Sequence, residues 1–362
     1  MAITQDQVKD ALQAVIDPNT GKDLVATKSI TSIKIDGGHI SVEATLGYPS
    51  RTQREPIGEA IQACLAKLPG AAKVEVKVVS RIDAHSVQRG VKLVPGVKNI
   101  IAVASGKGGV GKSTTAVNIA LALADEGATV GILDADIYGP SQPMMLGIAG
   151  KPESKDGKTM EPMMGHGLQS ISIGYMIAAD TPMVWRGPMV TQALEQLVNQ
   201  THWKDVDYLV VDLPPGTGDI QLTLAQKVPV TGVVIVTTPQ DIALIDARKG
   251  LKMFEKVSIP ILGIVENMSM HICSNCGHAE AIFGSGGAEK MCHDYGTELL
   301  GQLPLDIKIR EQTDAGRPTV VADPKSVAAE IYRKIGRRIA VKLSEQAKDM
   351  SSKFPNIVIQ NT

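Results

Sequence analysis

A glycine-rich loop between an apolar run and a helical pattern constrains the fold of this 362-residue chain more than any other feature. The apolar residues 100–104 lead into residues 105–114, which read SGKGGVGKST, and a helical pattern follows at once. The loop fits the pattern G-x-x-x-x-G-K-[ST] in the strand–loop–helix setting that the pattern requires. Its glycines let successive backbone N–H groups converge on phosphate oxygens, and the following helix adds its positive N-terminal end. The sequence therefore predicts a phosphate-binding loop.

Two residues at the end of the loop have predicted roles of their own. Lys112 would reach the β- and γ-phosphates, and the Ser113 hydroxyl would bind Mg²⁺. The predicted cofactors are therefore ATP and Mg²⁺. The predicted nucleotide-binding residues of the loop are Gly106, Lys107, Gly108, Gly109, Val110, Gly111, Lys112, Ser113 and Thr114.

The rest of the C-terminal region alternates short apolar runs with helical segments. The runs lie at residues 100–104, 130–133, 208–211, 233–236 and 261–265, and helical patterns cover residues 115–126 and 242–256. Continuously apolar strands separated by helices indicate a parallel sheet covered on both faces. The predicted fold class is α/β, a P-loop NTPase with a mostly parallel sheet, preceded by a small α+β domain.

That small domain is predicted from the first eighty residues. Thr4 and Gln7 form a capping box before a helix that carries Val8, Leu12, Val15 and Ile16. Two alternating runs around Asp36-Gly37-Gly38 indicate a β-hairpin, and a second helix and a third strand follow. The predicted boundaries are residues 1–85 for this domain, 86–97 for a linker, and 98–362 for the ATPase domain.

The second residue of the loop, Lys107, is unusual for the general pattern. With it the loop resembles the deviant Walker A motif, K-G-G-x-G-K-[ST], of the MinD/ParA/nitrogenase-reductase superfamily. The resemblance implies that Lys107 reaches the nucleotide of a second subunit, where a cation stabilises the charge that develops during phosphoryl transfer. Lys107 and Lys112 are therefore expected to be catalytic, and a homodimer is expected.

Polar residues follow three further strands of the predicted sheet. Asp134 and Asp136 follow residues 130–133 and resemble the switch aspartates of the superfamily, with Asp136 expected to orient the attacking water. Asp212 follows residues 208–211 and fits the Walker B role of holding Mg²⁺. The family resemblance also implies that Asn267 lies where adenine is recognised. Because ligands of parallel sheets lie at the carboxyl ends of the strands, these residues are expected to converge.

A Cys-x-x-Cys motif is the second chemical feature. Cys273 and Cys276 can hold one edge of a metal site or cluster, but they supply only half of a tetrahedral set. Two subunits could share one cluster or zinc ion through both pairs. A single chain could instead complete a zinc site with His278, Cys292 or His293, or the pair could be a redox dithiol.

The combination of motifs resembles one branch of the superfamily closely. The deviant loop, the run DLPPGTGD at residues 212–219 and the downstream cysteine pair look like the Mrp/ApbC-type iron–sulfur cluster carrier proteins, many of which begin with a MIP18-type domain. The resemblance implies a homodimer that binds a [4Fe–4S] cluster between two Cys273/Cys276 pairs, hydrolyses ATP and transfers the cluster to apo-proteins. An assembly scaffold is an expected further partner. Free-standing MIP18-type domains often carry a cysteine where this chain has Tyr48, so a docking role is expected for the first domain.

Composition limits the alternatives. A net charge of −1 and 3% aromatic residues give no indication of nucleic-acid binding. The absence of an export signal and of an apolar run of about 18 residues argues for a cytoplasmic protein without stable membrane insertion. A MinD/ParA-like positioning ATPase stays open, because residues 327–342 form a basic amphipathic helix, although packing on the sheet is the favoured interpretation. A zinc-binding ATPase, and a kinase or amidoligase whose second pocket would involve residues 160–189, stay open as well.

Overall fold

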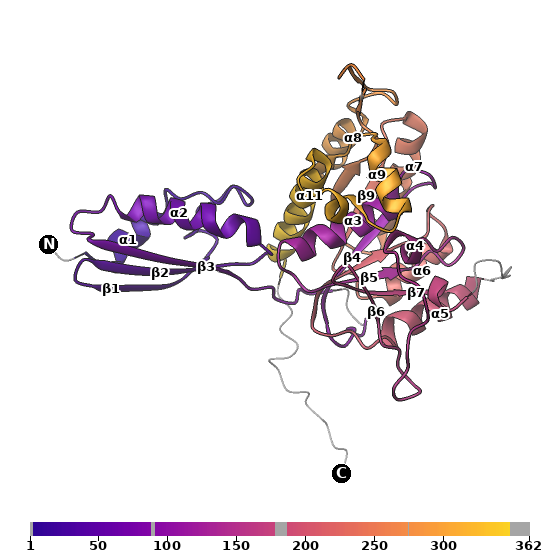
Figure 1. Cartoon of the computed structure of the whole chain (residues 1–362), viewed down its shortest axis with the longest axis horizontal. Helices are drawn as coiled ribbons and strands as arrows, with labels where there is room; N and C mark the ends of the chain where they lie inside the picture. The colour runs from indigo at the N-terminus through magenta and orange to yellow at the C-terminus, as the bar shows by residue number, and fades with distance from the viewer. Residues whose placement is uncertain (1–2, 88–90, 178–186, 274, 348–362) are drawn as a thin grey trace, which may run out of the picture.

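The computed structural model describes residues 3–87, 91–177, 187–273 and 275–347. They form a small part with a three-stranded sheet and a larger part with an eight-stranded sheet (Figure 1). The first strand of the larger sheet begins at Val97. The exact boundaries of the linker, residues 86–97, stay a prediction.

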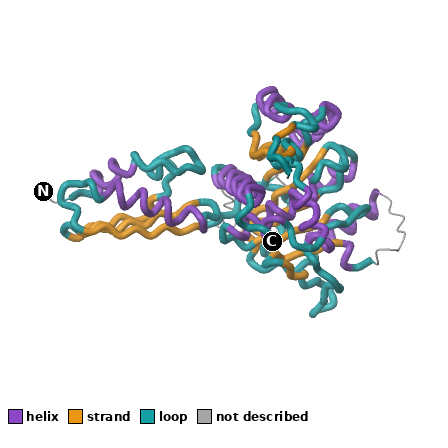
Figure 2. The backbone as a smooth tube through the Cα atoms, turned by 45° about the horizontal axis from the view of Figure 1, so that its top comes forward, coloured by secondary structure: helices purple, strands orange, loops and turns teal. Residues whose placement is uncertain are grey.

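The small part is an α+β layer in which two helices lie along one face of the sheet (Figure 2). Its elements are α1 (Gln5–Leu12), β1 (Ile30–Asp36), β2 (His39–Leu46), α2 (Arg54–Leu65) and β3 (Lys73–Ser80). The predicted hairpin is confirmed, since β1 and β2 pair antiparallel with Ile35 opposite Ile40. Strand β3 pairs parallel to β2, which requires the crossover through α2.

Helix α1 has the predicted start but an earlier end. The capping box between Thr4 and Gln7 is confirmed. The helix ends at Leu12, so the prediction that it includes Val15 and Ile16 is wrong. The Ile16 side chain is 55% exposed, and its backbone instead bridges to Asp23. The helical spacing of apolar residues in the sequence thus extends about one turn beyond the end of the helix.

The larger sheet has the strand order β13-β10-β9-β4-β8-β5-β7-β6. All neighbouring pairs are parallel except β6 with β7. The strands are β4 (Val97–Ser105), β5 (Val130–Asp134), β6 (Met163–Gly165), β7 (Leu168–Ser172), β8 (Val206–Asp212), β9 (Gly232–Thr237), β10 (Ile261–Glu266) and β13 (Leu299–Gln302). Each apolar run predicted as a strand lies in this sheet.

Helices cover both faces of the larger sheet, as predicted. Alternate residues of β4 enter two different cores: Ile101 packs with residues of α3 and α11, whereas Ile100 packs with residues of α5 and α7. The helices are α3 (Lys112–Asp125), α4 (Gln142–Met145), α5 (Gly187–Asn199), α6 (Asp219–Lys227), α7 (Asp241–Lys256), α8 (Gly287–Tyr295), α9 (Ile307–Asp314), α10 (Thr319–Ala322) and α11 (Val327–Ser344). Within the described ranges, every helix is too short or too polar to cross a bilayer.

The basic amphipathic helix near the C-terminus is α11, and its apolar side packs inward. Ile335 and Ile339 are fully buried in the core that also contains Ile119 of α3. The favoured interpretation, packing on the body of the protein, is therefore confirmed for these positions. Val327, at the start of the helix, is 77% exposed and does not share in that packing.

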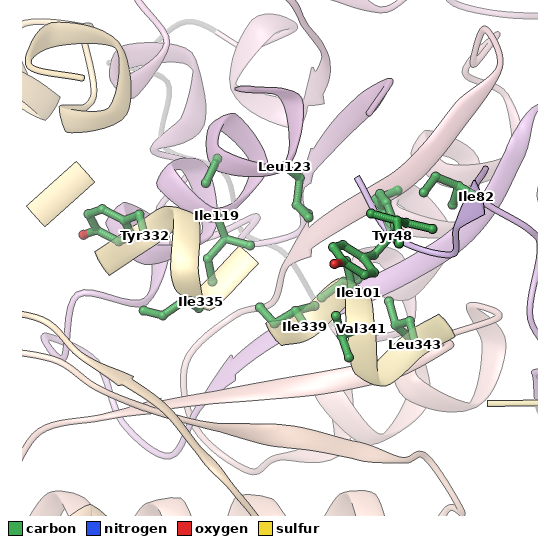
Figure 3. Packing of buried hydrophobic residues seen from close by; sticks show 14 of the residues in the cluster. Tyr48, Ile82, Ile101, Ile119, Leu123, Tyr332, Ile335, Ile339, Val341 and Leu343 are labelled. Carbon is green, nitrogen blue, oxygen red and sulfur yellow. The ribbon is translucent and has the colours of Figure 1, made fainter. Parts of the chain in front are cut away.

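The two parts of the molecule share a continuous apolar core. Tyr48 and Ile82, from the small part, lie in one cluster with Ile339, Val341 and Leu343 of α11 (Figure 3). A buried apolar junction of this kind holds the small part against the last helix of the larger part.

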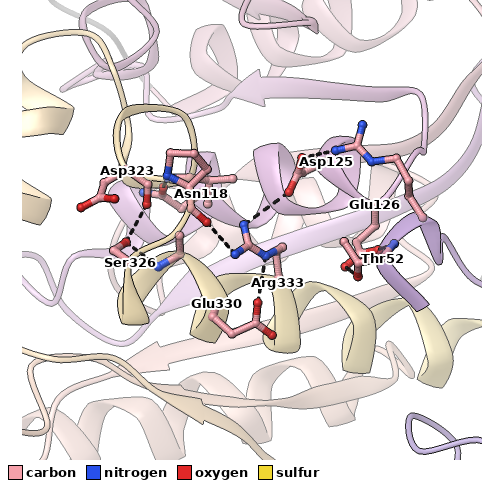
Figure 4. Close-up of polar contacts among 12 residues, drawn as sticks. Thr52, Asn118, Asp125, Glu126, Asp323, Ser326, Glu330 and Arg333 are labelled. Carbon is pink, nitrogen blue, oxygen red and sulfur yellow. Dashed lines mark hydrogen bonds and ion pairs between the residues drawn. The ribbon is translucent and has the colours of Figure 1, made fainter. Parts of the chain in front are cut away.

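Polar contacts surround that apolar junction at the end of α3. The carboxylate of Glu126 is buried, and it accepts hydrogen bonds from the backbone N–H (3.0 Å) and hydroxyl (2.6 Å) of Thr52. Arg337 of α11 forms an ion pair with the same carboxylate at 2.5 Å. Asp125, the last residue of α3, pairs with Arg51 of the small part and with Arg333 of α11 (Figure 4). The end of α3 is therefore a polar hub between the small part and α11.

Candidate functional site

The glycine-rich loop joins the central strand β4 to the start of α3. Gly109 and Gly111 have φ values of +82° and +80°, a backbone conformation that glycine adopts without steric cost. A Cβ atom on Gly111 would lie 2.1 Å from the side-chain nitrogen of Asn267. Glycine is therefore required at position 111 for two reasons: the positive φ of the backbone and the close approach of the Asn267 side chain.

The lysine and the aspartate predicted to bind phosphate and Mg²⁺ lie together at the carboxyl edge of the sheet. Nζ of Lys112 is 2.5 Å from Oδ1 of Asp212 and 3.1 Å from the hydroxyl oxygen of Ser113. The Lys112 side chain is only 6% exposed, and that of Asp212 is fully buried. The structure thus brings together three residues that the sequence predicted separately.

Asp134 organises the segment that follows β5. Its carboxylate accepts hydrogen bonds from the backbone N–H groups of Asp136 (3.2 Å), Ser141 (2.9 Å) and Gln142 (3.0 Å), and from the Ser172 hydroxyl (3.1 Å). Burial, reinforced by the negative charge of Asp212, raises the pKa of Asp134 to about 7. Asp134 is therefore placed to fix the backbone of this segment.

Asp136 lies two residues further on and is half-buried. Burial raises the pKa of its carboxyl group. Lys112 opposes this shift through its positive charge, and Asp212 adds to it. Asp136 is thus within the electrostatic field of the site, and its predicted role with the attacking water stays a prediction.

Asn267 follows β10 and contacts the glycine-rich loop directly. Its Nδ2 donates a hydrogen bond of 2.9 Å to the carbonyl oxygen of Val110. The side chain is 8% exposed. Asn267 therefore fastens the end of β10 to the loop, and its predicted contact with adenine stays a prediction.

Lys107 lies on the same loop but has a different environment from Lys112. It is half-buried, and its carbonyl oxygen accepts a hydrogen bond of 2.9 Å from the Ser105 hydroxyl. Across the described ranges, no hydrogen bond or ion pair is formed by its ammonium group. Within the described part of the chain, the ammonium group therefore takes no part in holding the fold together.

Gln142 is a residue of the site that sequence reasoning missed. It is fully buried at the start of α4, and its side-chain Nε2 donates to Oδ2 of Asp212 at 2.9 Å. A single glutamine within GPSQP has no spacing or composition that distinguishes it from a surface turn. Only the folded arrangement of β5, α4 and β8 reveals the contact.

The cysteine pair lies on a small hairpin formed by β11 (His271–Ile272) and β12 (Ala279–Glu280). The hairpin projects from the body of the larger part beyond α8 (Figure 1). The N–H of Cys273 donates to the His278 carbonyl (2.9 Å), and the N–H of Gly277 donates to the Cys273 carbonyl (2.8 Å), so the segment forms a tight knuckle. Ser274 lies outside the described residues.

The pKa of the Cys273 thiol lies below its ordinary value. Backbone N–H groups of Cys276 and Asn275 lower its pKa by hydrogen bonding to the sulfur. Cys273 is half-exposed and Cys276 is exposed. Because the thiolate is the form that binds metals, this exposed knuckle suits a metal or cluster ligand pair.

The proposed single-chain zinc site gains no support from the geometry. Cys292 is buried in a core formed with α7 and β10, and burial raises the pKa of its thiol to about 11. Among the residues that the structure describes, no group of three or more His, Cys, Asp or Glu side chains is placed to hold a metal ion. The segment at residues 160–189, considered for a kinase pocket, lies partly outside the described residues.

The oxygen atoms around Lys112 suit a magnesium ion. Asp212 supplies a buried carboxylate and Ser113 a hydroxyl. Hard oxygen donors of this kind are the ligands and neighbours that Mg²⁺ prefers. A phosphate-binding loop between a central parallel strand and a helix, with these residues at the same sheet edge, defines a P-loop NTPase.

Comparison with known proteins specifies the family. A family model described as "NUBPL iron-transfer P-loop NTPase" matches residues 96–340, and one described as "Iron-sulfur cluster assembly protein" matches residues 5–78. The chain therefore belongs to the NUBPL iron-transfer P-loop NTPase family.

Individual relatives agree with this assignment. An "Iron-sulfur cluster carrier protein" of Escherichia coli is 52% identical over 355 residues, which cover 95% of this chain and 96% of the relative. A solved nucleotide-binding protein of Archaeoglobus fulgidus, in complex with ADP, is 36% identical with a TM-score of 0.56, covering 64% of this chain and 90% of its own. The cell division ATPase MinD of Pyrococcus furiosus, 23% identical with a TM-score of 0.52, covers 67% of this chain and 98% of its own and shows the shared fold.

Proposed function

We propose that this P-loop NTPase carries a [4Fe–4S] cluster, bound between the Cys273/Cys276 pairs of two subunits, and transfers it to apo-proteins. The observation that carries the proposal is the exposed cysteine knuckle with a lowered Cys273 pKa. The printed name of the Escherichia coli relative supports the same cargo. Mg²⁺, held by Ser113 and Asp212, would neutralise phosphate charge during ATP hydrolysis.

A short path connects the cysteine knuckle to the nucleotide loop. Asn267 bonds the loop at Val110, and the chain then runs directly from Asn267 into β11 and Cys273. The backbone N–H of Ser269 along this path donates to the Leu303 carbonyl at 2.9 Å. The connection is short, and hydrogen bonds to Val110 and Leu303 hold it in place. A conformational change in the nucleotide loop would therefore be expected to shift the cysteine pair as well. We therefore propose that ATP turnover acts on cluster loading or release.

The bridging cluster can be tested by anaerobic reconstitution with iron and sulfide. The wild-type protein should acquire the absorption of a [4Fe–4S] centre, with about four iron and four sulfide per dimer. The Cys273→Ala/Cys276→Ala variant should acquire neither. Cys292→Ala is the matched control, because it removes a cysteine from α8 and leaves the knuckle intact. A colourless protein that binds one zinc ion per chain through Cys273 and Cys276 would rule out the bridging cluster.

The homodimer is proposed from Lys107. Its uncommitted ammonium group is available to a nucleotide in a second subunit, as the deviant loop implies. The Lys107→Ala and Asp136→Ala variants should each bind ATP but hydrolyse it slowly. A mixture should regain activity, because the mixed dimer contains one site with an intact Asp136 and an intact partner lysine. Mixed dimers that form and stay inactive would contradict a role for Lys107 in trans.

Partners and location follow from the proposed cargo. Apo iron–sulfur proteins would receive the cluster, and an assembly scaffold would supply it. Thiolate ligands at Cys273 and Cys276 require a reducing compartment, so we propose a cytoplasmic location. The positioning-ATPase alternative is not favoured, because α11 packs Ile335 and Ile339 into the core, away from any membrane surface.

A further inference from the structure

Gln142 connects the two acidic segments of the nucleotide site. Its backbone N–H donates to Oδ2 of Asp134 at 3.0 Å, which holds the start of α4 against the end of β5. Its side chain points the other way, and Nε2 donates to Oδ2 of Asp212 at 2.9 Å and to the Ser113 carbonyl at 3.2 Å. One fully buried residue therefore contacts the β5 aspartate, the β8 aspartate and the first turn of α3.

The contact determines how the Asp212 carboxylate is oriented. Oδ1 faces the ammonium group of Lys112, and Oδ2 faces the amide of Gln142. Nucleotide phosphates would attract Lys112, so the ammonium group is a partner that can leave. The amide of Gln142 is neutral and is anchored through its own backbone to Asp134. It is the donor that would keep Asp212 in place once phosphates are bound.

The other end of the amide is left without a partner. Oε1 of Gln142 is buried and accepts no hydrogen bond within the described structure. Native proteins rarely bury an acceptor in this way, because an unsatisfied polar atom is costly. A hydrophobic side chain of similar size would avoid the cost, so the amide is explained better by what Nε2 does for Asp212 than by packing.

We propose that Gln142 is a positioning residue for magnesium-dependent nucleotide binding. It holds the Asp212 carboxylate in the orientation that Mg²⁺ requires, and it links that carboxylate to the Asp134 segment. The inference rests on the proposed role of Asp212 as the aspartate of the Mg²⁺ site.

The test compares ATP affinity with Mg²⁺ and with EDTA in the full-length protein. In Gln142→Leu, affinity in EDTA should stay within about twofold of wild type, whereas affinity in Mg²⁺ should fall about tenfold, the value of one hydrogen bond to a charged group. The Mg²⁺ concentration for half-maximal binding should rise by a similar factor. Gln169→Leu is the matched control, since Gln169 is also buried but its side chain bonds, among the residues described, only to the backbone of Lys204.

Three outcomes separate the inference from its premise. Loss of affinity with Mg²⁺ only, in Gln142→Leu but not in Gln169→Leu, supports the inference. An equal loss in EDTA and Mg²⁺, or an unchanged Mg²⁺ dependence, overturns it. Asp212→Asn is measured in parallel: if that variant also leaves the Mg²⁺ dependence unchanged, the proposed role of Asp212 fails together with the inference. Circular dichroism of each variant checks that the fold is retained.

Discussion

Lys112 and Asp212 form a buried ion pair in the nucleotide site, with 2.5 Å between Nζ and Oδ1. Each residue is expected to have another partner during turnover, phosphate for the lysine and Mg²⁺ for the aspartate. The ion pair therefore orients both side chains when no nucleotide is bound. In the proposed site, binding of ATP with Mg²⁺ would replace this ion pair by a contact of Lys112 with phosphate and a contact of Asp212 with the metal ion.

The first prediction concerns that pair. Asp212→Ala leaves the buried Lys112 without its carboxylate and should lower the free energy of unfolding by roughly 3 kcal/mol in the absence of nucleotide. The double variant Lys112→Met/Asp212→Leu should recover most of this loss, because it removes both buried charges, while ATP binding stays absent. Urea unfolding followed by circular dichroism measures the difference. Equal stability of the single and double variants would contradict the prediction.

The second prediction concerns the polar hub at the end of α3. Glu126→Ala removes the acceptor of both Thr52 hydrogen bonds and one of the two ion-pair partners of the buried Arg337, which keeps Glu330. The free energy of unfolding should fall by roughly 3 kcal/mol, because two charge-assisted hydrogen bonds and a buried ion pair are lost together. Glu345→Ala is the control, because its ion pair with Lys22 is exposed and should contribute no more than about 1 kcal/mol. Similar losses of unfolding free energy in both variants would contradict the prediction that the buried Glu126 pair stabilises the protein more than the exposed Glu345 pair.

The third prediction concerns the small part. The Tyr48 hydroxyl lies 2.9 Å from both oxygens of the buried Asp17, and burial together with the charge of Asp17 raises the tyrosine pKa. Tyr48→Phe should destabilise the small part by about 1–3 kcal/mol, because the buried carboxylate loses the donor that contacts both of its oxygens and keeps, among the residues described, only Asn19. Hydrogen exchange in β2 and α1 reports this locally. Tyr138→Phe, at a 58% exposed position, should have no measurable effect.

The fourth prediction is a pH dependence of thiol reactivity. With a pKa of about 11, Cys292 should be only ~0.1% thiolate at pH 8, so iodoacetamide should modify it slowly, and the rate should rise until the pH passes about 11. The lowered pKa of Cys273 has the opposite sign, so its rate should level off at a lower pH. Mass spectrometry of alkylated peptides measures both rates. Modification of Cys292 as fast as Cys273 at pH 8 would contradict the assignment.

The sequence predicted the parts of the site that depend on local pattern. A motif such as residues 105–114 determines its own loop, and parallel strands bring their carboxyl ends to one edge, so the meeting of Lys112 with Asp212 followed from the strand assignments. Contacts that depend on two distant elements had no such signal. The bond between Gln142 and Asp212 requires the exact placement of a four-residue helix. The buried Tyr48–Asp17 pair and the parallel pairing of β3 likewise arise only in the assembled small part.

Helix α3 connects the nucleotide site to the contact with the small part. Its first residue, Lys112, is part of the phosphate loop, and its last residue, Asp125, is paired with Arg51 of the small part. Over its 14 residues the helix is about 21 Å long. One continuous element therefore has its first residue in the nucleotide site and its last residue in the polar hub that contacts the small part. The phosphate loop and the small part are neighbours of the same helix, although the strand before the loop and the strands of the small part belong to different sheets.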